Sequence, residues 1–113
     1  MSSKLSVIKF LNQTHSGRAE IIDKRNLDLT INADGSITKD KTIALSIITA
    51  DCAPIFFIDI KKEIICAIHA GWKGTKNNII KNGVKFMLEY EVVKLWFEAY
   101  PGCNPNLQSK YIP

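Results

Sequence analysis

Two apolar runs that each end in a reactive side chain constrain this fold most. Residues 43–50 lead into Asp51 and Cys52, and residues 64–68 lead into His69. Both runs are rich in isoleucine and other aliphatic residues, which is typical of buried strands. A buried strand that ends in a reactive residue and is followed by a glycine turn is a common way to build a site in α/β proteins. We therefore predict an α/β protein with its site at the ends of these two strands.

The remaining pattern adds further strands around this pair. Alternating apolar and polar residues predict a half-buried strand over 27–31, and Asp34-Gly35 indicates a turn after it. Lys61-Lys62 is expected to join two strands into a hairpin. The predicted strands are 6–10, 19–22, 27–31, 42–50, 55–60, 63–68 and 92–99.

A helix is predicted after Gly74, where the apolar spacing changes. Thr75 is expected to cap this helix, and the apolar positions that follow have helical spacing: Ile79, Ile80, Gly83, Val84, Met87 and Leu88. Glycine within a helix costs about 1 kcal/mol relative to alanine, so Gly83 is expected to mark close packing. No periodicity remains after Tyr100.

Length, charge and cysteine content exclude several classes of protein. The 113 residues correspond to one domain or part of one, and no apolar run approaches the about 18 residues that a membrane span needs. There is no signal peptide pattern, and three cysteines without paired spacing favour a reducing, cytoplasmic setting. The net charge is +4 and the pI about 9.0, but the lysines are scattered. This charge is interpreted as a solvated surface, and no nucleic-acid partner is expected.

Three side chains could together bind a metal ion. Zinc prefers imidazole nitrogen and thiolate sulfur, and a catalytic zinc site uses three protein ligands with the fourth position open. His15, Cys52 and His69 would supply such a set, and the chain has only these two histidines. Spacing alone leaves an alternative open, in which the cysteine is a small buried hydrophobe and each histidine a hydrogen-bonded structural residue. Cys66, inside an apolar run, is expected to be inert core.

A second arrangement uses the same residues for nucleophilic catalysis. Cys52 could attack an acyl group while His69 acts as its base, provided that the two side chains come within hydrogen-bond reach. Asp51 could orient a histidine or an incoming group, or it could cap a turn before Pro54. This alternative is a cysteine-dependent amide hydrolase.

The turn after His69 has the character of an anion site. Gly71 and Gly74 let the backbone approach a ligand closely, and free N–H groups at the start of the helix, together with Lys73 and Thr75, could hold a phosphate. Trp72 could stack on a flat ring or cover the core, and the core interpretation is favoured.

The motifs in these segments resemble those of the multicopper polyphenol oxidoreductase (laccase-like, YfiH) family. Gln13-Thr14-His15 matches the family's Q-x-H, residues 49–54 match T-A-D-C-x-P, and residues 69–74 match H-A-G-W-[RK]-G. Ala33-Asp34 is similar to an A-D motif between the first two. Three motifs in the same order are far more specific than any one of them.

The resemblance implies a zinc-dependent purine nucleoside phosphorylase with adenosine deaminase side activity. It implies that His15, Cys52 and His69 bind the zinc, and that mixed sheets are flanked by helices, as in the cytotoxic-necrotizing-factor deamidases. A purine nucleoside and phosphate would be the small-molecule partners. Copper is disfavoured although it is in the family's name, because a multicopper site needs many histidines and this chain has two.

The resemblance covers residues 8–98 of a partial domain, 1–113, and residues 99–113 diverge from the family. Where I-G-P-C-I is expected, the chain has Tyr100-Pro101-Gly102-Cys103-Asn104. The chain is therefore identified as a member truncated at both ends, which could be inactive as a non-catalytic, metal-binding remnant. Strand edges that missing segments would cover are expected to cause self-association.

Overall fold

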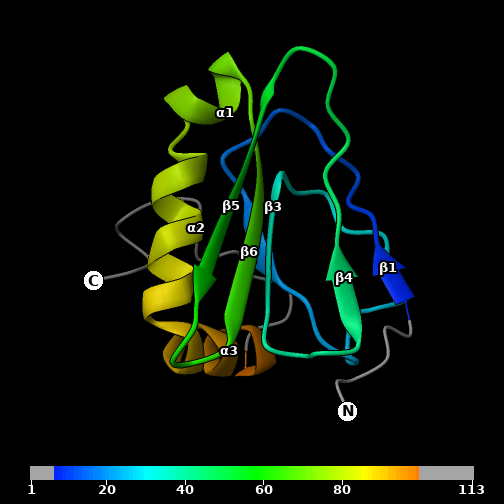
Figure 1. Ribbon diagram of the computed structural model, residues 1–113, viewed down its shortest axis with the longest axis vertical. Coiled ribbons are helices and arrows are strands. Elements are labelled where there is room, and N and C mark those ends of the chain that lie inside the picture. The colour runs from blue at the N-terminus through cyan, green and yellow to red at the C-terminus, as the bar shows by residue number, and fades with distance from the viewer. Residues whose placement is uncertain (1–6, 100–113) are drawn as a thin grey trace.

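Residues 7–99 are described by the computed structural model, in which two sheets are accompanied by helices (Figure 1). No helix in this range is long and apolar enough to cross a membrane. Of the divergent tail predicted over 99–113, residues 100–113, with Cys103, lie outside the described residues. In chain order the elements are β1 (Val7–Lys9), β2 (Ala19–Ile21), β3 (Gly35–Thr38), β4 (Ile43–Leu45), β5 (Ala53–Asp59), β6 (Ile64–Ala70), α1 (Trp72–Lys76), α2 (Ile79–Leu88) and α3 (Tyr90–Ala99).

The larger sheet has the strand order β2-β3-β6-β5. Strands β2 and β3 are parallel, and the pairs β3–β6 and β6–β5 are antiparallel, so the sheet is mixed as predicted. The hairpin expected around Lys61-Lys62 is confirmed, and its register pairs Ala53 with Ala70. Cys52, just before β5, and Gly71, just after β6, therefore meet at one end of the hairpin. Strands β1 and β4 form a separate parallel pair.

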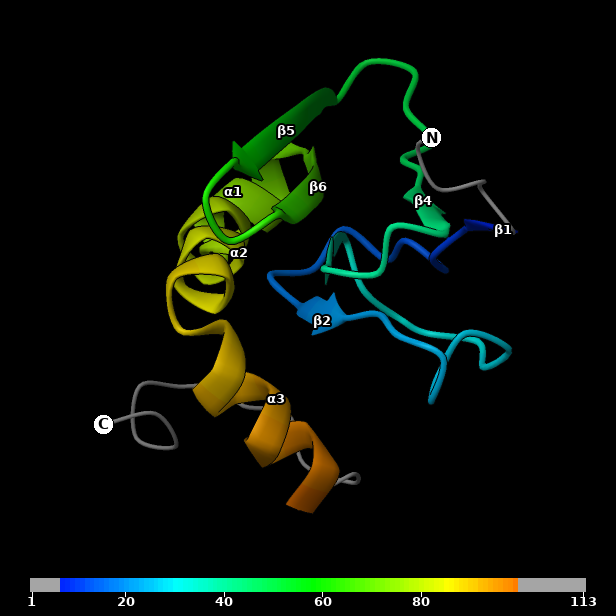
Figure 2. The same ribbon diagram turned by 60° about the horizontal axis from the view of Figure 1, so that its bottom comes forward.

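Helix α2 covers one side of the larger sheet, as both views show (Figures 1 and 2). Its buried side chains, among them Ile79 and Phe86, pack into a cluster with residues of β2, β3 and β6. The predicted helix is confirmed, and so is the close packing at Gly83. A Cβ atom there would lie 2.5 Å from Cδ1 of Ile68 and 3.2 Å from Sγ of Cys66. This packing fixes the helix against the strand that carries His69.

The strand predicted over 27–31 is wrong, because this segment folds as turns beside the β1–β4 pair. Lys9 is buried, and its ammonium donates to the carbonyl oxygens of Leu27 at 2.8 Å and Leu29 at 2.5 Å. A buried lysine charge needs such partners. Those carbonyls therefore serve the lysine instead of a neighbouring strand. The alternation in the sequence instead buries Ile31 and half-buries Leu27 in a second apolar cluster with Ile43.

The strand predicted over 42–50 is shorter in the structure, where β4 ends at Leu45. The segment between Leu45 and Cys52 has no strand partner, and one of its residues pairs with a side chain instead. The amide of Gln13 donates to the carbonyl oxygen of Ile48 at 2.7 Å and accepts from its N–H at 2.8 Å. One side-chain amide thus replaces a strand partner for that residue, a substitution that hydrophobic pattern alone does not reveal.

The strand predicted over 92–99 is also wrong, because these residues form α3. Tyr90 and Val93 are buried three positions apart, on one helical face, while Val92 is exposed. Lys94 and Glu98 lie 3.6 Å apart in an i,i+4 ion pair on the surface. Paired valines favour a strand locally, but burial of this helical face against the sheet cluster outweighs that preference.

The turn predicted at Asp34-Gly35 is instead the start of β3. Gly35 is the first residue of the strand, and there is little space for a side chain at this position. A Cβ there would be 3.2 Å from Cβ of Ala19 and 3.3 Å from Cδ1 of Ile79. The glycine therefore allows β2, β3 and α2 to approach closely. Asp34 directly precedes β3, one of the two inner strands of the sheet, and is fully buried.

Candidate functional site

The fold brings together three side chains that are far apart in the sequence. His15 comes from the loop between β1 and β2, Cys52 directly precedes β5, and His69 lies at the end of β6. Their candidate ligand atoms all lie within 4.8 Å of one another. The centres of the two imidazole rings are 5.1 Å apart, and the ring planes form an angle of 68°. Within the described residues, this is the group of histidine, cysteine and acidic side chains that could hold a metal ion.

His69 is oriented by a buried carboxylate. Its Nδ1 atom lies 2.7 Å from Oδ2 of Asp34, and the side chains of His69 and Asp34 are 4% and 0% exposed. The hydrogen bond engages Nδ1 and leaves Nε2 as the nitrogen that can face a ligand. Burial raises the pKa of Asp34, but hydrogen bonds from His69, Ser16 and Thr14 outweigh it, so the pKa lies below its usual value.

The same carboxylate organises the loop that carries His15. Its oxygens accept hydrogen bonds from the backbone N–H groups of Thr14 at 3.1 Å, His15 at 3.1 Å and Ser16 at 2.8 Å. The hydroxyl of Ser16 adds a fourth at 2.8 Å. His15 has a φ angle of 61°, which lies in the left-handed region that residues other than glycine rarely adopt. Consecutive N–H groups that converge on one anion are what stabilise such a conformation.

Hydrogen bonds from two side chains, those of Gln13 and Thr49, fix the segment that leads to Cys52. Gln13, two residues before His15, binds both backbone groups of Ile48. Thr49 donates its hydroxyl hydrogen to the carbonyl oxygen of Cys52, which closes the short loop before β5. The Q-x-H segment therefore supplies a candidate ligand and also tethers the segment of the second ligand.

The predicted close approach of the backbone at the glycine turn is present. A Cβ atom on Gly71 would lie 2.9 Å from Sγ of Cys52 and 3.5 Å from Cδ2 of His15. At Gly74, a Cβ would lie 3.0 Å from the carbonyl oxygen of Ser16. Gly71 therefore lets the turn pack directly against the side chains of Cys52 and His15, and Gly74 lets it pack against the backbone of Ser16, next to His15.

Two expectations about this turn are wrong. Thr75 does not cap the helix, since α1 begins at Trp72 after Gly71 and Thr75 lies inside it; α2 is a separate helix. Trp72 does not cover the core, because it is 74% exposed. A residue at the first helical position beside a glycine cap projects into solvent here. The ammonium of Lys73 lies 5.6 Å from the centre of its ring.

Asp34 is the residue that chemical reasoning from the sequence missed. The prediction that Asp51 could orient a histidine does not hold for His69, because Asp51 is exposed and His69 pairs with Asp34 instead. An aspartate before glycine usually indicates a turn. The similarity of Ala33-Asp34 to a family motif was the one signal that could have identified it.

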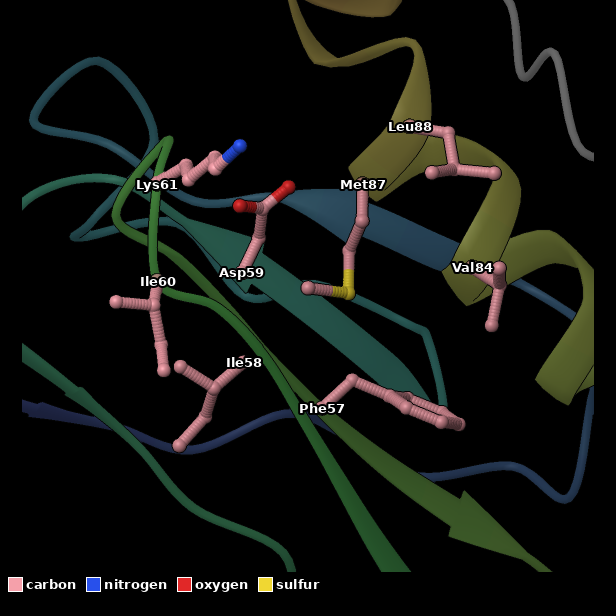
Figure 3. A pocket seen from close by; sticks show the side chains of 8 residues that line it. All are labelled: Phe57, Ile58, Asp59, Ile60, Lys61, Val84, Met87 and Leu88. Atoms are coloured by element: carbon pink, nitrogen blue, oxygen red, sulfur yellow. The ribbon is translucent and has the colours of Figure 1, made fainter.

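Two other features lie away from the cluster. Cys66 is buried, and burial raises the pKa of its thiol to about 12, which confirms the inert-core interpretation. A shallow groove of about 420 Å³ lies at the end of β5 that is farthest from Cys52 (Figure 3), and its lining consists of residues 57–61 together with Val84, Met87 and Leu88 of α2. Its lining is mostly apolar and offers no metal ligand besides Asp59.

Comparison with known proteins assigns the family. A family model described as multi-copper polyphenol oxidoreductase laccase matches residues 1–102. The chain is 41% identical over 86 residues to a Rickettsia prowazekii protein named purine nucleoside phosphorylase, covering 76% of this chain and 35% of that protein. It is 34% identical over 105 residues to purine nucleoside phosphorylase YlmD of Bacillus subtilis, covering 86% and 34%. A protein named adenosine deaminase RL5, from an unknown prokaryote, is 37% identical over 83 residues, covering 66% and 32%.

Solved structures have the same fold. YfiH of Bacillus licheniformis matches with a TM-score of 0.66 and 29% identity, over 74% of this chain and 34% of that one. Protein NMB0706 of Neisseria meningitidis matches with a TM-score of 0.65 and 32% identity, over 71% and 33%. The chain thus spans about a third of the length of the relatives it matches.

Proposed function

Because this chain belongs to the multi-copper polyphenol oxidoreductase laccase family, we propose that it carries the zinc site of a purine nucleoside phosphorylase. The observation that supports this most is the convergence of His15, Cys52 and His69. Relatives named purine nucleoside phosphorylase or adenosine deaminase supply the substrate class, a purine nucleoside. The activity of those longer proteins is extended to this chain as part of the proposal.

The donor set fits zinc. Two imidazole nitrogens and one thiolate are ligands that zinc prefers, and three protein ligands leave a fourth position for water or substrate. A tetrahedral zinc with bonds of about 2.0–2.3 Å keeps its ligand atoms roughly 3.3–3.8 Å apart. Candidate atoms within 4.8 Å of one another need to close by only about 1 Å. Copper is disfavoured because a multicopper centre needs more histidines than the two of this chain.

The residues around the cluster fit the two substrates. In phosphorolysis a phosphate oxygen bonds to the anomeric carbon of the ribose while the glycosidic bond breaks, and the electron pair leaves with the base, which takes up a proton. The ammonium of Lys73, the backbone N–H groups that directly follow Gly71 and the hydroxyl of Thr75 are proposed to hold the phosphate, with Gly74 allowing the turn to pack closely. The exposed ring of Trp72 is available to stack on the purine. A bound zinc supplies a Lewis acid that polarises or orients the nucleoside.

Two measurements test this function. Purified protein is expected to contain about one zinc per chain, and Cys52→Ala should lose it, whereas Cys66→Ala should keep it. Inosine or adenosine is expected to release free base only when phosphate is present. Zinc retained in the Cys52 variant would contradict the ligand set, and release of base without phosphate would indicate a hydrolase.

A second candidate function is favoured by one contact. The contact is the one between Asp34 and His69, whose ring also lies near Cys52. A carboxylate, a base and a nucleophile in this order are what a cysteine-dependent amide hydrolase uses. A chelator separates the two functions, since it should abolish zinc-dependent turnover but leave a thiol nucleophile active. A non-catalytic metal-binding protein would contain zinc and turn over no purine nucleoside.

The cellular setting follows from the same chemistry. A thiolate such as that of Cys52 stays available as a ligand where cysteines are kept reduced, which is the condition of the cytoplasm. We therefore extend the proposal to a cytoplasmic location. Asp51, exposed beside Cys52, is retained in it as a group that could contact an incoming substrate.

A further inference from the structure

One buried carboxylate contacts the segments of both histidines in the cluster. Oδ2 of Asp34 lies 2.7 Å from Nδ1 of His69 and accepts from the N–H of His15 at 3.1 Å. Oδ1 accepts from the N–H of Thr14 and from the N–H and hydroxyl of Ser16. The backbone of Asp34 adds a further link, since its carbonyl accepts from the N–H of His69 at 2.7 Å.

We propose that Asp34 is a positioning residue that couples the two histidines of the metal site, fixing the ring of His69 and the backbone of His15 with one carboxylate. The inference rests on the proposed zinc site for its purpose. Every contact involved is made between atoms of this chain, so the role of Asp34 can also be measured on metal-free protein.

A carboxylate suits this position better than any neutral side chain. Each oxygen of Asp34 accepts from two or more groups, and an ionised carboxylate only accepts. An asparagine has one oxygen and one NH₂ group, so it would turn a donor toward either His69 or the loop at 14–16. Steric size is nearly unchanged in Asp34→Asn, and the variant therefore removes the acceptor and its charge while keeping the volume.

The contact to His69 has a consequence for its proton. An acceptor on Nδ1 places the hydrogen there and leaves Nε2 with the lone pair that binds a metal. The contacts to the loop keep His15 at its left-handed φ of 61°. Without Asp34, the two imidazoles would have to be reoriented as the metal binds, and partners of this kind typically contribute 10–100-fold to metal affinity.

The first experiment uses the metal-free protein. Nitrogen-15 NMR of the two imidazoles, assigned with a His15→Asn variant, reports which ring nitrogen of His69 carries the hydrogen. We expect the hydrogen on Nδ1 in the unsubstituted chain. Asp34→Asn should either lose it from that position, when its NH₂ group faces His69, or shift the amide resonances of residues 14–16, when its NH₂ group faces that loop. A hydrogen on Nε2 in the unsubstituted metal-free protein would overturn the proposal. This readout does not depend on whether the protein binds zinc or has any activity.

The second experiment measures metal affinity by competition with a chelator, using zinc and then cobalt. Asp34→Asn is expected to bind zinc 10–100-fold more weakly and to alter the cobalt absorption bands that report tetrahedral geometry. Asp40→Asn is the matched control. Asp40 also accepts from a backbone N–H and a hydroxyl, both of Thr42, but follows the opposite end of β3. Equal zinc affinity in a folded Asp34→Asn would overturn the proposal.

A milder variant covers the case in which Asp34→Asn does not fold. Ser16→Ala removes one hydroxyl donor from the carboxylate and leaves both histidines untouched. It is expected to weaken zinc binding by a few-fold, and unchanged affinity would count against the coupling. If the unsubstituted chain binds no zinc, the proposed function fails, and the position of the hydrogen on His69 still decides the role of Asp34.

Discussion

Substitution of Gly71 by alanine tests how tightly the glycine turn fits the cluster. The new Cβ would lie 2.9 Å from Sγ of Cys52, whereas carbon and its neighbours pack best at about 3.5–4.0 Å. The sulfur therefore has to move by roughly 0.6–1.1 Å. A turn of about 30° about the side-chain torsion of Cys52 would cost on the order of 0.5–1.5 kcal/mol.

The backbone itself tolerates the change. Gly71 has φ −88° and ψ 179°, an extended conformation that alanine adopts without strain. Replacing glycine at such a position stabilises a protein by about 0.4–1 kcal/mol through the unfolded state. This gain and the cost at Cys52 nearly offset each other, so the metal-free melting temperature should change little.

Metal binding should respond much more than stability. Site geometry is productive only within about 0.5 Å, and the displacement of the sulfur exceeds that. We expect Gly71→Ala to bind zinc at least about 10-fold more weakly, which corresponds to about 1.4 kcal/mol. The assays are competition with a chelator for affinity and thermal unfolding in chelator for stability.

Gly83→Ala is the matched control, because its Cβ would lie 2.5 Å from Cδ1 of Ile68 in the core. Overpacking costs about 1–3 kcal/mol, and the better helix propensity of alanine returns about 1 kcal/mol of it. This variant should therefore lose stability and keep its zinc affinity. A Gly71→Ala protein that binds zinc as tightly as the unsubstituted chain would refute the close fit between the turn and Cys52.

Three further predictions follow from other parts of the structure. In a Cys103→Ser background, iodoacetamide at pH 8 should modify Cys52, and bound zinc should protect Cys52 from it. Cys66 should stay unmodified until the protein unfolds, because burial raises the pKa of its thiol to about 12. Labelling of Cys66 in the folded protein would contradict this. Trp72→Ala should change unfolding free energy by less than about 0.5 kcal/mol, since the ring is exposed, but should weaken nucleoside binding in calorimetry. Ile58→Lys, on the exposed face of the edge strand β5, should lower any concentration-dependent association seen by light scattering, and an unchanged mass would exclude this edge.

The elements that position the cluster could be predicted because their signals are local. The run that becomes β6 and the helical spacing of α2 are strong patterns, and both form at nearly the predicted residues. Their burial agrees with their propensity, so no tertiary contact reverses the preference. The candidate triplet His15, Cys52 and His69 could be proposed because its motifs resemble those of the family, whereas spacing and side-chain chemistry alone left structural roles open.

The errors occur where a side chain replaces a strand partner or packing reverses a propensity. Lys9 takes up the carbonyls of the segment expected as a strand at 27–31, and Gln13 pairs with Ile48 in place of a longer β4. The valines of α3 favour a strand but pack as a helix. Asp34 carries the turn signal of its dipeptide, and only the fold shows that the segments of both histidines converge on its carboxylate.

Zinc-edge X-ray absorption of the purified, zinc-loaded chain tests the central claim most directly. If His15, Cys52 and His69 are the ligands, the first shell contains one sulfur at about 2.3 Å and nitrogen or oxygen neighbours at about 2.0–2.1 Å, with imidazole scattering from two rings. Cys52→Ser should remove the sulfur contribution and leave the imidazoles. A first shell without sulfur in the unsubstituted chain, or with more than one sulfur per zinc, would contradict the site.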